Sequence, residues 1–420
     1  MTAIGTRQRF GSHLGLERIA LVCEALGNPQ KDLKFVHIAG TSGKGSVAAY
    51  LAAVLKRSGL RVGLFTSPHL VDYAERFQLN GDLIDAETLE MVVDQAEWAC
   101  RQVEEEHPEY GPVTEFELAT AAGFLFFRQA RADIVVLETG LGGRLDATNV
   151  VKPEISVITT VHLDHQDRLG STVAEIAREK GGIIKEGVPV ISGAKLPEAD
   201  DVLREIARAK GAPYFRVKDV PWEGLGWDLG GGRLLFPGLG EVSIGLLGDH
   251  QLENAAVALL TLEKLRESGY NLPDEAIYGG MKEAVWPGRL EIVSPSPLFI
   301  LDGAHNQEGL TALERSLREL QERCGAEKFT IVFGMLGNKD CGLLDPLLPL
   351  ARRFVFTAAQ SSRLPPMQPE ILKAYVESRG VEASAFSSVV QALEEAQKTN
   401  PVCVCGSLYL VGEVKRVLPS

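Results

Sequence analysis

Lys44 and Ser46, in the glycine-rich segment GTSGKGS (residues 40–46), are the first residues whose types and spacing suggest chemistry. The common phosphate-binding loop reads G-x-x-x-x-G-K-S/T, and its backbone N–H groups and lysine surround the phosphates. Here Gly45 separates the lysine from the serine, so the composition matches and the spacing is shifted. We interpret residues 40–46 as a nucleotide-phosphate loop, with Ser46 as a candidate Mg²⁺ ligand. A plain glycine turn is the alternative.

Glu138 is the strongest candidate outside this loop. It directly follows the apolar run IVVL (residues 134–137), and a glycine-rich segment comes after it. Packing explains a carboxylate at the end of a buried strand poorly. Beside a phosphate loop, however, it suits Mg²⁺, which prefers oxygen ligands. A salt bridge with Arg144 is the structural alternative.

Polar side chains also end other strand-like runs. Ser67 closes GLFTS, and His162, Asp164 and His165 follow SVITTV. Ligands of open α/β sheets bind beyond the carboxyl ends of the strands, so these residues would join the phosphate loop at one rim if the strands are neighbours. Histidines and aspartates so close together suggest a metal site, and a polar loop is the open alternative.

A second candidate edge lies in LDGAHNQEGL, where Asp302, His305 and Asn306 fall at a strand-to-helix turn. Shortly before it, WPGRLE contains Arg289, whose guanidinium can bind a phosphate in bidentate fashion. A structural role near a linker is the alternative for Arg289. Lys180, in AEIAREKGGIIK, has no feature that separates it from an ordinary surface lysine of a helix.

The elements that must position these residues alternate between strands and helices. Apolar β-branched runs predict strands, and apolar residues at helical spacing predict helices. The predicted strands are residues 33–39, 61–67, 133–140, 155–164 and 188–193, and the predicted helices include residues 46–59, 86–106 and 116–130. This alternation is typical of a mostly parallel sheet with helices on both faces. The glycine-rich stretch 221–248 breaks it and predicts a small antiparallel β element.

A proline-rich segment around residues 286–298 predicts a boundary, because the α/β alternation restarts after it. The later predicted strands lie within residues 298–304, 329–335, 353–358, 383–388 and 401–407. We therefore predict an α/β protein with two domains. The first, residues 1–290, is a P-loop-type ATPase domain with a mostly parallel sheet. The second, residues 291–420, is a smaller Rossmann-like domain.

Composition narrows the class of protein. The 420-residue chain carries a net charge of −13, which does not favour a nucleic-acid partner. No apolar run approaches the roughly 20 residues that span a bilayer, and the first residues lack an apolar signal core. Of the six cysteines only Cys403 and Cys405 are close together, and no second pair completes a zinc site. We expect a cytoplasmic protein with reduced thiols and no membrane partner.

A set of motifs in fixed order resembles one enzyme family. GTSGKGS, TSPHL, ETGLGGRLDATN, LDHQDRLG, GDHQLENAAVA, WPGRLE, DGAHN and GSLYLVGE follow one another along the chain. Together they resemble the folylpolyglutamate synthase and dihydrofolate synthase family, a branch of the Mur-type amide ligases. The resemblance runs from about residue 10 to residue 415. It also accounts for the shifted Lys-Gly-Ser loop, which is the form that such ligases use.

The resemblance implies an ATP-dependent ligase with two Mg²⁺ sites. ATP would phosphorylate a carboxylate of a pteroate or folate, and the amine of L-glutamate would then displace phosphate to give an amide. The segment SPHLVDYAERFQLNG resembles the bifunctional bacterial form, which accepts dihydropteroate as well as folates. A monofunctional folylpolyglutamate synthase, which only extends the glutamate tail, is the alternative.

Motif matching also implies roles for individual residues. The implied ATP-binding residues are Gly40, Thr41, Ser42, Gly43, Lys44, Gly45, Ser46, Asn254, Arg289 and Asp302. The implied metal ligands are Ser67, Glu138 and His165, and the implied folate-pocket residues are Phe116, Asp146 and Ala147. The implied catalytic residues are Lys44, Lys180, His305 and Ser407. Lys180 matches the lysine that is carbamylated in the superfamily, and His305 and Ser407 match residues near the incoming glutamate.

Two other classes remain open. A ligase that extends a cell-wall nucleotide precursor usually has an extra N-terminal domain for a UDP-sugar, and the chain offers little room for one before residue 40. A nucleotide switch without bond-forming chemistry would leave Glu138 and the second candidate edge unexplained. We expect small-molecule substrates only, and a monomer, because no coiled-coil pattern is present.

Overall fold

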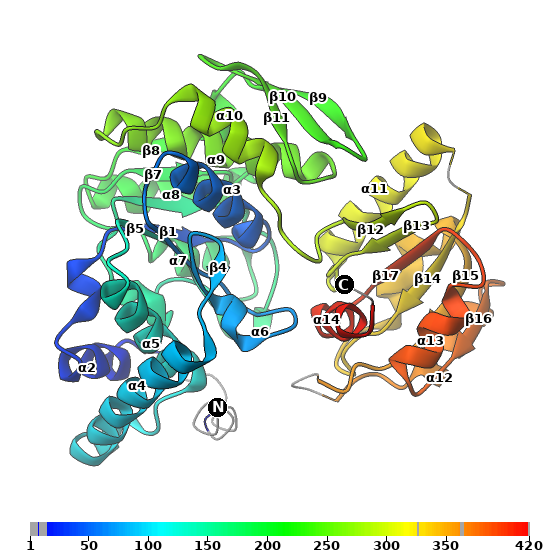
Figure 1. Cartoon of the computed structure of the whole chain (residues 1–420), viewed down its shortest axis with the longest axis horizontal. Helices are drawn as coiled ribbons and strands as arrows, with labels where there is room; N and C mark the ends of the chain where they lie inside the picture. The colour runs from blue at the N-terminus through cyan, green and yellow to red at the C-terminus, as the bar shows by residue number, and fades with distance from the viewer. Residues whose placement is uncertain (1–6, 8–14, 326, 362–364, 419–420) are drawn as a thin grey trace.

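The computed structural model describes residues 7, 15–325, 327–361 and 365–418. Figure 1 shows two α/β bodies, joined by the segment that follows α10 (Asp274–Glu283). The first is built on an eight-stranded sheet and the second on a six-stranded sheet. The predicted fold class is confirmed, whereas the division of the chain at residue 290 into two domains stays a prediction. Most of the N-terminal segment that was expected to lack a signal sequence lies outside the described residues.

The first sheet has the strand order β4-β3-β2-β5-β1-β6-β7-β8. The six strands from β2 to β8 in this order pair in parallel, whereas β3 and β4 pair antiparallel. The bounds are β1 Phe35–Ala39, β2 Val62–Phe65, β3 Phe77–Leu79, β4 Asp82–Leu83, β5 Ile134–Glu138, β6 Ile155–Ile158, β7 Val190–Ser192 and β8 Tyr214–Arg216. The strands that precede the candidate residues, β2, β5, β1 and β6, are therefore neighbours, as a common rim requires.

Helices cover both faces of this sheet. Val36 and Ile38 of β1 pack with α3, α9 and α10, whereas Phe35 packs on the opposite face with α2, α4 and α5. Burial on both faces explains why these strands are almost continuously apolar. The helices of this body are α2 Glu17–Ala25, α3 Lys44–Arg57, α4 Ala86–Glu106, α5 Glu115–Gln129, α6 Gln166–Leu169, α7 Val173–Gly181, α8 Pro197–Ala209, α9 Asp249–Glu267 and α10. Short 3₁₀ turns are η2 Pro29–Asp32, η3 Tyr73–Arg76, η4 Pro108–Tyr110, η5 Ala147–Val150 and η6 Val217–Asp219.

All five strands predicted for the first sheet are shorter than predicted, and for two of them the difference affects candidate residues. β2 ends at Phe65 and β6 ends at Ile158, so Ser67 and His165 lie on loops beyond the strand ends. The backbone at these positions is outside the regular strands, so the polar side chains can point toward a ligand.

The antiparallel β element predicted for residues 221–248 is confirmed. It consists of β9 Glu223–Asp228, β10 Gly231–Phe236 and β11 Gly240–Ile244, with β10 in the centre. It packs closely on α9, because a Cβ added at Gly232 would lie 2.9 Å from a methyl carbon of Leu252.

The second body has the strand order β12-β13-β17-β14-β15-β16, parallel except for the pair β12 and β13. Its strands are β12 Glu291–Pro295, β13 Leu298–Leu301, β14 Phe329–Phe333, β15 Ala351–Phe356, β16 Glu382–Ala385 and β17 Val402–Cys405. Its helices are α11 Gln307–Cys324, η7 Cys341–Leu350, α12 Pro369–Glu377, α13 Val389–Ala396 and α14 Leu408–Val417. No described helix is long and apolar enough to cross a membrane.

Candidate active site

The glycine-rich loop connects β1 to the first turn of α3. Gly43 has φ +83°, a left-handed conformation that glycine adopts without strain, and it stands directly before Lys44, the first residue of α3. The loop is tied to the end of β6: Thr41 N donates to Thr160 O (2.8 Å), and Thr159 Oγ1 donates to Ser42 O (2.6 Å). The backbone N–H groups at the start of α3 can thus receive an anion.

Helix α9 braces this loop from the other side. Gln251 Nε2 donates to Ser46 Oγ (3.1 Å), and Asn254 Nδ2 donates to Gln251 Oε1 (3.0 Å). A Cβ at Gly43 would lie 2.3 Å from Asn254 Oδ1, so only glycine fits there. Lys44 Nζ donates to Gly40 O (3.1 Å), which holds the ammonium group over the loop.

A cavity of about 290 Å³ unites most of the predicted residues. All residues of the loop, 40–46, line it. It is also lined by Ser67, Glu138, His165, Lys180, Asn254, Arg289, Asp302 and His305. These residues come from both bodies, so the cavity is an interface site between the first sheet and the second.

Glu138 is buried at the end of β5, with 4% of its surface exposed. Burial raises the pKa of Glu138, and the charge of Lys44 and a hydrogen bond from Ser67 N (3.2 Å) oppose that rise. Arg144 instead forms an ion pair with Glu179 (2.8 Å), so the alternative salt bridge to Glu138 is wrong. A buried carboxylate that faces a cavity is suited to hold a cation.

His165 lies on the loop after β6 with φ +47°, and its side chain is 55% exposed. His162 points elsewhere: its Nε2 lies 3.0 Å from Glu308 Oε1 of α11. Among the described residues, no three His, Cys, Asp or Glu side chains form a cluster that could hold a metal. The HLDHQD segment therefore brings His165 to the cavity while His162 faces α11.

Lys180 is not a surface residue. It lies near the end of α7 with 3% of its surface exposed, and it lines the cavity. Burial, and after it the charge of Lys44, lowers the pKa of Lys180 to about 7. A large fraction of this amine is therefore uncharged at neutral pH, which makes it nucleophilic.

Residues of the second body complete the cavity. Asp302 accepts hydrogen bonds from Leu290 N (2.7 Å) and Ala304 N (2.8 Å). It thereby fixes the linker, the segment between α10 and β12, against the turn between β13 and α11. Burial lowers the pKa of His305, which favours its neutral form. Ser407 is buried and caps α14 by accepting a hydrogen bond from Tyr409 N (3.1 Å). Its neighbour Leu408 lines the cavity, and Ser407 does not.

A second cavity, of about 320 Å³, is lined by Phe116, Asp146 and Ala147. It shares Ser67 and His165 with the first cavity. The Asp146 carboxylate is already engaged by its own loop. One oxygen accepts from the backbone of residues 140 (2.9 Å) and 141 (2.8 Å), and the other accepts from the backbone N–H (3.0 Å) and hydroxyl (2.5 Å) of residue 148. Asp146 therefore shapes this wall by holding the loop.

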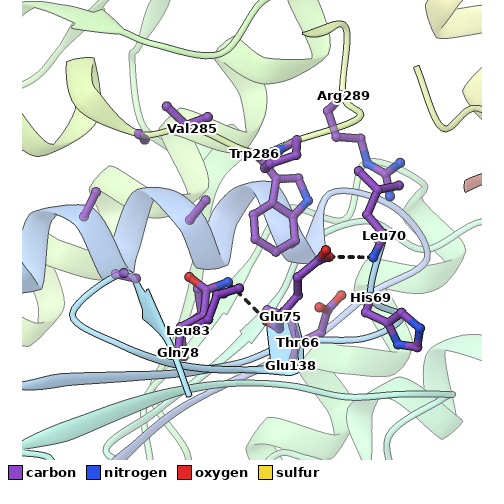
Figure 2. A pocket seen from close by; sticks show the side chains of 18 of the residues that line it. Thr66, His69, Leu70, Glu75, Gln78, Leu83, Glu138, Val285, Trp286 and Arg289 are labelled. Carbon is purple, nitrogen blue, oxygen red and sulfur yellow. Dashed lines mark hydrogen bonds between the residues drawn. The ribbon is translucent and has the colours of Figure 1, made fainter. Parts of the chain in front are cut away.

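A third cavity, of about 490 Å³, adjoins the first at Ser67, Glu138 and Arg289. Figure 2 shows the indole of Trp286 projecting into it from the linker. A Cβ at Gly45 would lie 2.6 Å from this indole, so the linker packs directly on the phosphate loop. Three residues at these cavities, Gln251, Trp286 and Glu308, were not predicted, although each lies in a motif that contains a predicted residue.

Two family models match the chain. Residues 38–262 match the Mur ligase middle domain, and residues 291–417 match the model described as dihydrofolate synthetase, C-terminal domain. The dihydrofolate synthase/folylpolyglutamate synthase of Bacillus subtilis is 35% identical over 425 residues, covering 98% of this chain and 96% of the relative.

Solved structures agree with the sequence matches. The folylpolyglutamate synthase of Thermotoga maritima is 35% identical with a TM-score of 0.87, covering 99% of this chain and 96% of that one. The Mycobacterium tuberculosis folylpolyglutamate synthase, solved with ADP and AMPPCP, is 29% identical with a TM-score of 0.88, covering 99% and 98%. This chain belongs to the folylpolyglutamate synthase and dihydrofolate synthase family of Mur-type ligases.

Proposed function

We propose that this protein is an ATP-dependent ligase that adds L-glutamate to dihydropteroate and to the γ-carboxylate of reduced folates. The observation that carries the proposal is the cavity between the two bodies. It joins a phosphate loop, the buried Glu138 and Lys180, and the turn that carries His305. The family's relatives include enzymes named for both reactions or for folylpolyglutamate synthesis alone. We assign the bifunctional form because the relatives from Bacillus subtilis and Escherichia coli, 35% and 34% identical to this chain, are named for both reactions. We assign the pterin to the cavity lined by Phe116.

The chemistry needs both phosphate transfer and protection from water. A carboxylate oxygen of the acceptor attacks the γ-phosphorus of ATP, ADP leaves, and an acyl phosphate forms. The glutamate nitrogen then attacks the acyl carbon, inorganic phosphate leaves, and the nitrogen loses a proton. We propose that residues 40–46 and Arg289 bind the ATP phosphates and that Asn254 contacts the base. Asp302 contributes a further nucleotide contact from the second body. We assign the binding of the incoming glutamate to His305, which lines the cavity; Ser407 does not line it and receives no substrate contact.

The residues present fit Mg²⁺. Glu138 and Ser67 offer oxygen ligands at the rim. Burial raises the pKa of Glu138 by disfavouring the charged carboxylate, and a bound cation would stabilise that charge. Mg²⁺ usually keeps waters and phosphate oxygens as ligands, so it requires no cage of protein carboxylates. We assign one ion to Ser67 and Glu138 and a second to His165. When bound, Mg²⁺ neutralises the charge that develops on the phosphates.

We assign Lys180 a carbamate. Its uncharged Nζ can add to the carbon of CO₂ and lose a proton. The product is a carbamate anion at a position where a protonated lysine would carry a positive charge. The pKa of about 7, set by burial and by the charge of Lys44, makes this addition feasible at neutral pH. The resulting carbamate would lie in the same cavity as Glu138 and His165.

We further propose a cytoplasmic monomer with small-molecule substrates. Cys23, Cys100, Cys341, Cys403 and Cys405 are free thiols, which suits a reducing compartment.

Phosphate release from MgATP tests the proposal against a nucleotide switch. A ligase releases phosphate only when both an acid acceptor and L-glutamate are present, because each is consumed. A switch hydrolyses ATP without them. Phosphate release that is indifferent to glutamate would refute the ligase assignment. Phosphate release that depends on a UDP-sugar precursor instead of a folate would indicate a ligase of cell-wall synthesis.

A further inference from the structure

Glu308 links the two bodies at the cavity that contains the phosphate loop. Its Oε2 accepts a hydrogen bond from Ser42 Oγ of the phosphate loop (2.8 Å). Its Oε1 lies 3.0 Å from Nε2 of His162, on the loop after β6. One carboxylate thus joins α11 to two separate loops of the first sheet, and all three elements line or flank the same cavity.

Glu308 lies in the first turn of α11, close to the residue that caps the helix. Asn306 caps the helix by accepting a hydrogen bond from Gly309 N (2.9 Å), and Glu308 is the second residue of the helix. An anionic side chain is stabilised in the first helical turn by the helix dipole. His305 precedes the cap directly, so fixing Glu308 also fixes the turn that carries His305.

Glu308 is an anion at neutral pH. Partial burial raises its pKa, but the hydrogen bond and charge of His162, the hydrogen bond from Ser42 and the charge of Lys195 more than offset that effect, so the pKa of Glu308 lies below its usual value. Hydrogen bonds to an ionised acceptor are stronger than those between neutral groups. Two such contacts from one side chain can therefore fix the start of α11 relative to the phosphate loop.

We propose that Glu308 is a positioning residue, which sets the turn carrying His305 against the phosphate loop through Ser42 and His162. This inference rests on the proposed ligase function. In that reaction the acyl phosphate forms at the phosphate loop, whereas the incoming amine approaches from the side of His305. The distance between these two sides decides whether the amine or water reaches the acyl carbon first.

The readout is the coupling ratio, the moles of glutamylated product formed per mole of phosphate released. In Glu308→Ala both contacts are lost, so we expect kcat for amide formation to fall on the order of tenfold, the usual loss for hydrogen bonds to a charged group. Phosphate release should fall less, so the coupling ratio falls. Glu308→Gln keeps the shape and loses the charge, and we expect an intermediate ratio. Glu314→Gln is the matched control, because Glu314 lies on the same helix and pairs with Arg318.

A double-mutant cycle with His162→Ala tests the contact itself. If Glu308 acts through His162, the effects of the two substitutions on the coupling ratio are less than additive. If the wild-type coupling ratio is near one and the ratio of Glu308→Ala is unchanged, the positioning role of Glu308 is refuted and the proposed ligase function is not. A fall in activity that only tracks a lower melting temperature, at constant ratio, also refutes it. A wild type that yields no glutamylated product refutes the proposed function instead.

Discussion

Replacement of Lys180 by alanine should remove most of the activity and make what remains depend on an added carboxylate. At pH 7 an amine with a pKa of about 7 is about half uncharged. An ordinary lysine, with a pKa near 10.4, is uncharged in only about one molecule in 2,500. Lys180 is thus on the order of a thousandfold better prepared to capture CO₂. Without the carbamate we expect kcat to fall on the order of 100-fold, as is typical when a group that supports a bound metal is lost. Formate or acetate should restore part of it.

The pKa of Lys180 also determines the expected pH dependence of the wild type. As pH falls below about 7 the amine of Lys180 becomes protonated, so activation by bicarbonate should weaken, and above that pH it should reach a plateau. Steady-state rates in CO₂-depleted buffer, with and without bicarbonate, measure this. Lys185→Ala is the control, because burial lowers the pKa of Lys185 to about 8 while its Nζ donates to Asn149 O (2.9 Å), away from the cavity. Full activity of Lys180→Ala without any added carboxylate would refute the reasoning.

Three further outcomes follow from the geometry. Glu138→Ala should reduce ligation on the order of 100-fold with an unchanged circular dichroism spectrum, and near-normal turnover would remove Glu138 from the metal site. Gly45→Ala places a Cβ 2.6 Å from the Trp286 indole; we expect the KM for ATP to rise on the order of tenfold and to recover partly in the double variant with Trp286→Ala, whereas additive losses would contradict this contact. Burial of His37 lowers its pKa to about 3. Between about pH 6.5 and 3, His37 is therefore protonated in the unfolded chain and neutral in the folded protein. In urea titrations the free energy of unfolding should therefore fall with decreasing pH by up to about 1.4 kcal/mol per pH unit more steeply than in His37→Leu; equal slopes would contradict it.

Local signals predicted much of the fold and of the first-sheet rim. The apolar runs before residues 40, 67, 138 and 165 predicted strands. Helices between β1, β2 and β5 favour their parallel pairing, whereas only the 3₁₀ turn η5 lies between β5 and β6. Because β2, β5, β1 and β6 are neighbours, polar residues that follow these strands necessarily meet at one edge. The type of residue and its place after a strand were sufficient for this part of the site.

The remaining part depends on tertiary packing that a sequence pattern does not contain. Lys180 occupies a helix position that looks exposed, and only the packing of α7 against the sheet buries it and lowers its pKa. Glu308 has its partners in Ser42 and His162, which are far away in the chain and come close only when the two bodies meet. Asp146 was expected to line a pterin pocket, and the structure shows that its carboxylate also holds the loop that forms the wall.

The mass of the reaction product shows directly whether the protein joins glutamate to each acceptor. The protein is incubated with MgATP and L-glutamate, once with 7,8-dihydropteroate and once with a reduced monoglutamyl folate. We expect each acceptor to gain one glutamyl residue while one ATP is converted to ADP and phosphate. A gain by the folate alone would limit the enzyme to tail extension and correct the assignment of the cavity lined by Phe116. No gain by either acceptor, with phosphate release at background level, would refute the proposed ligase function.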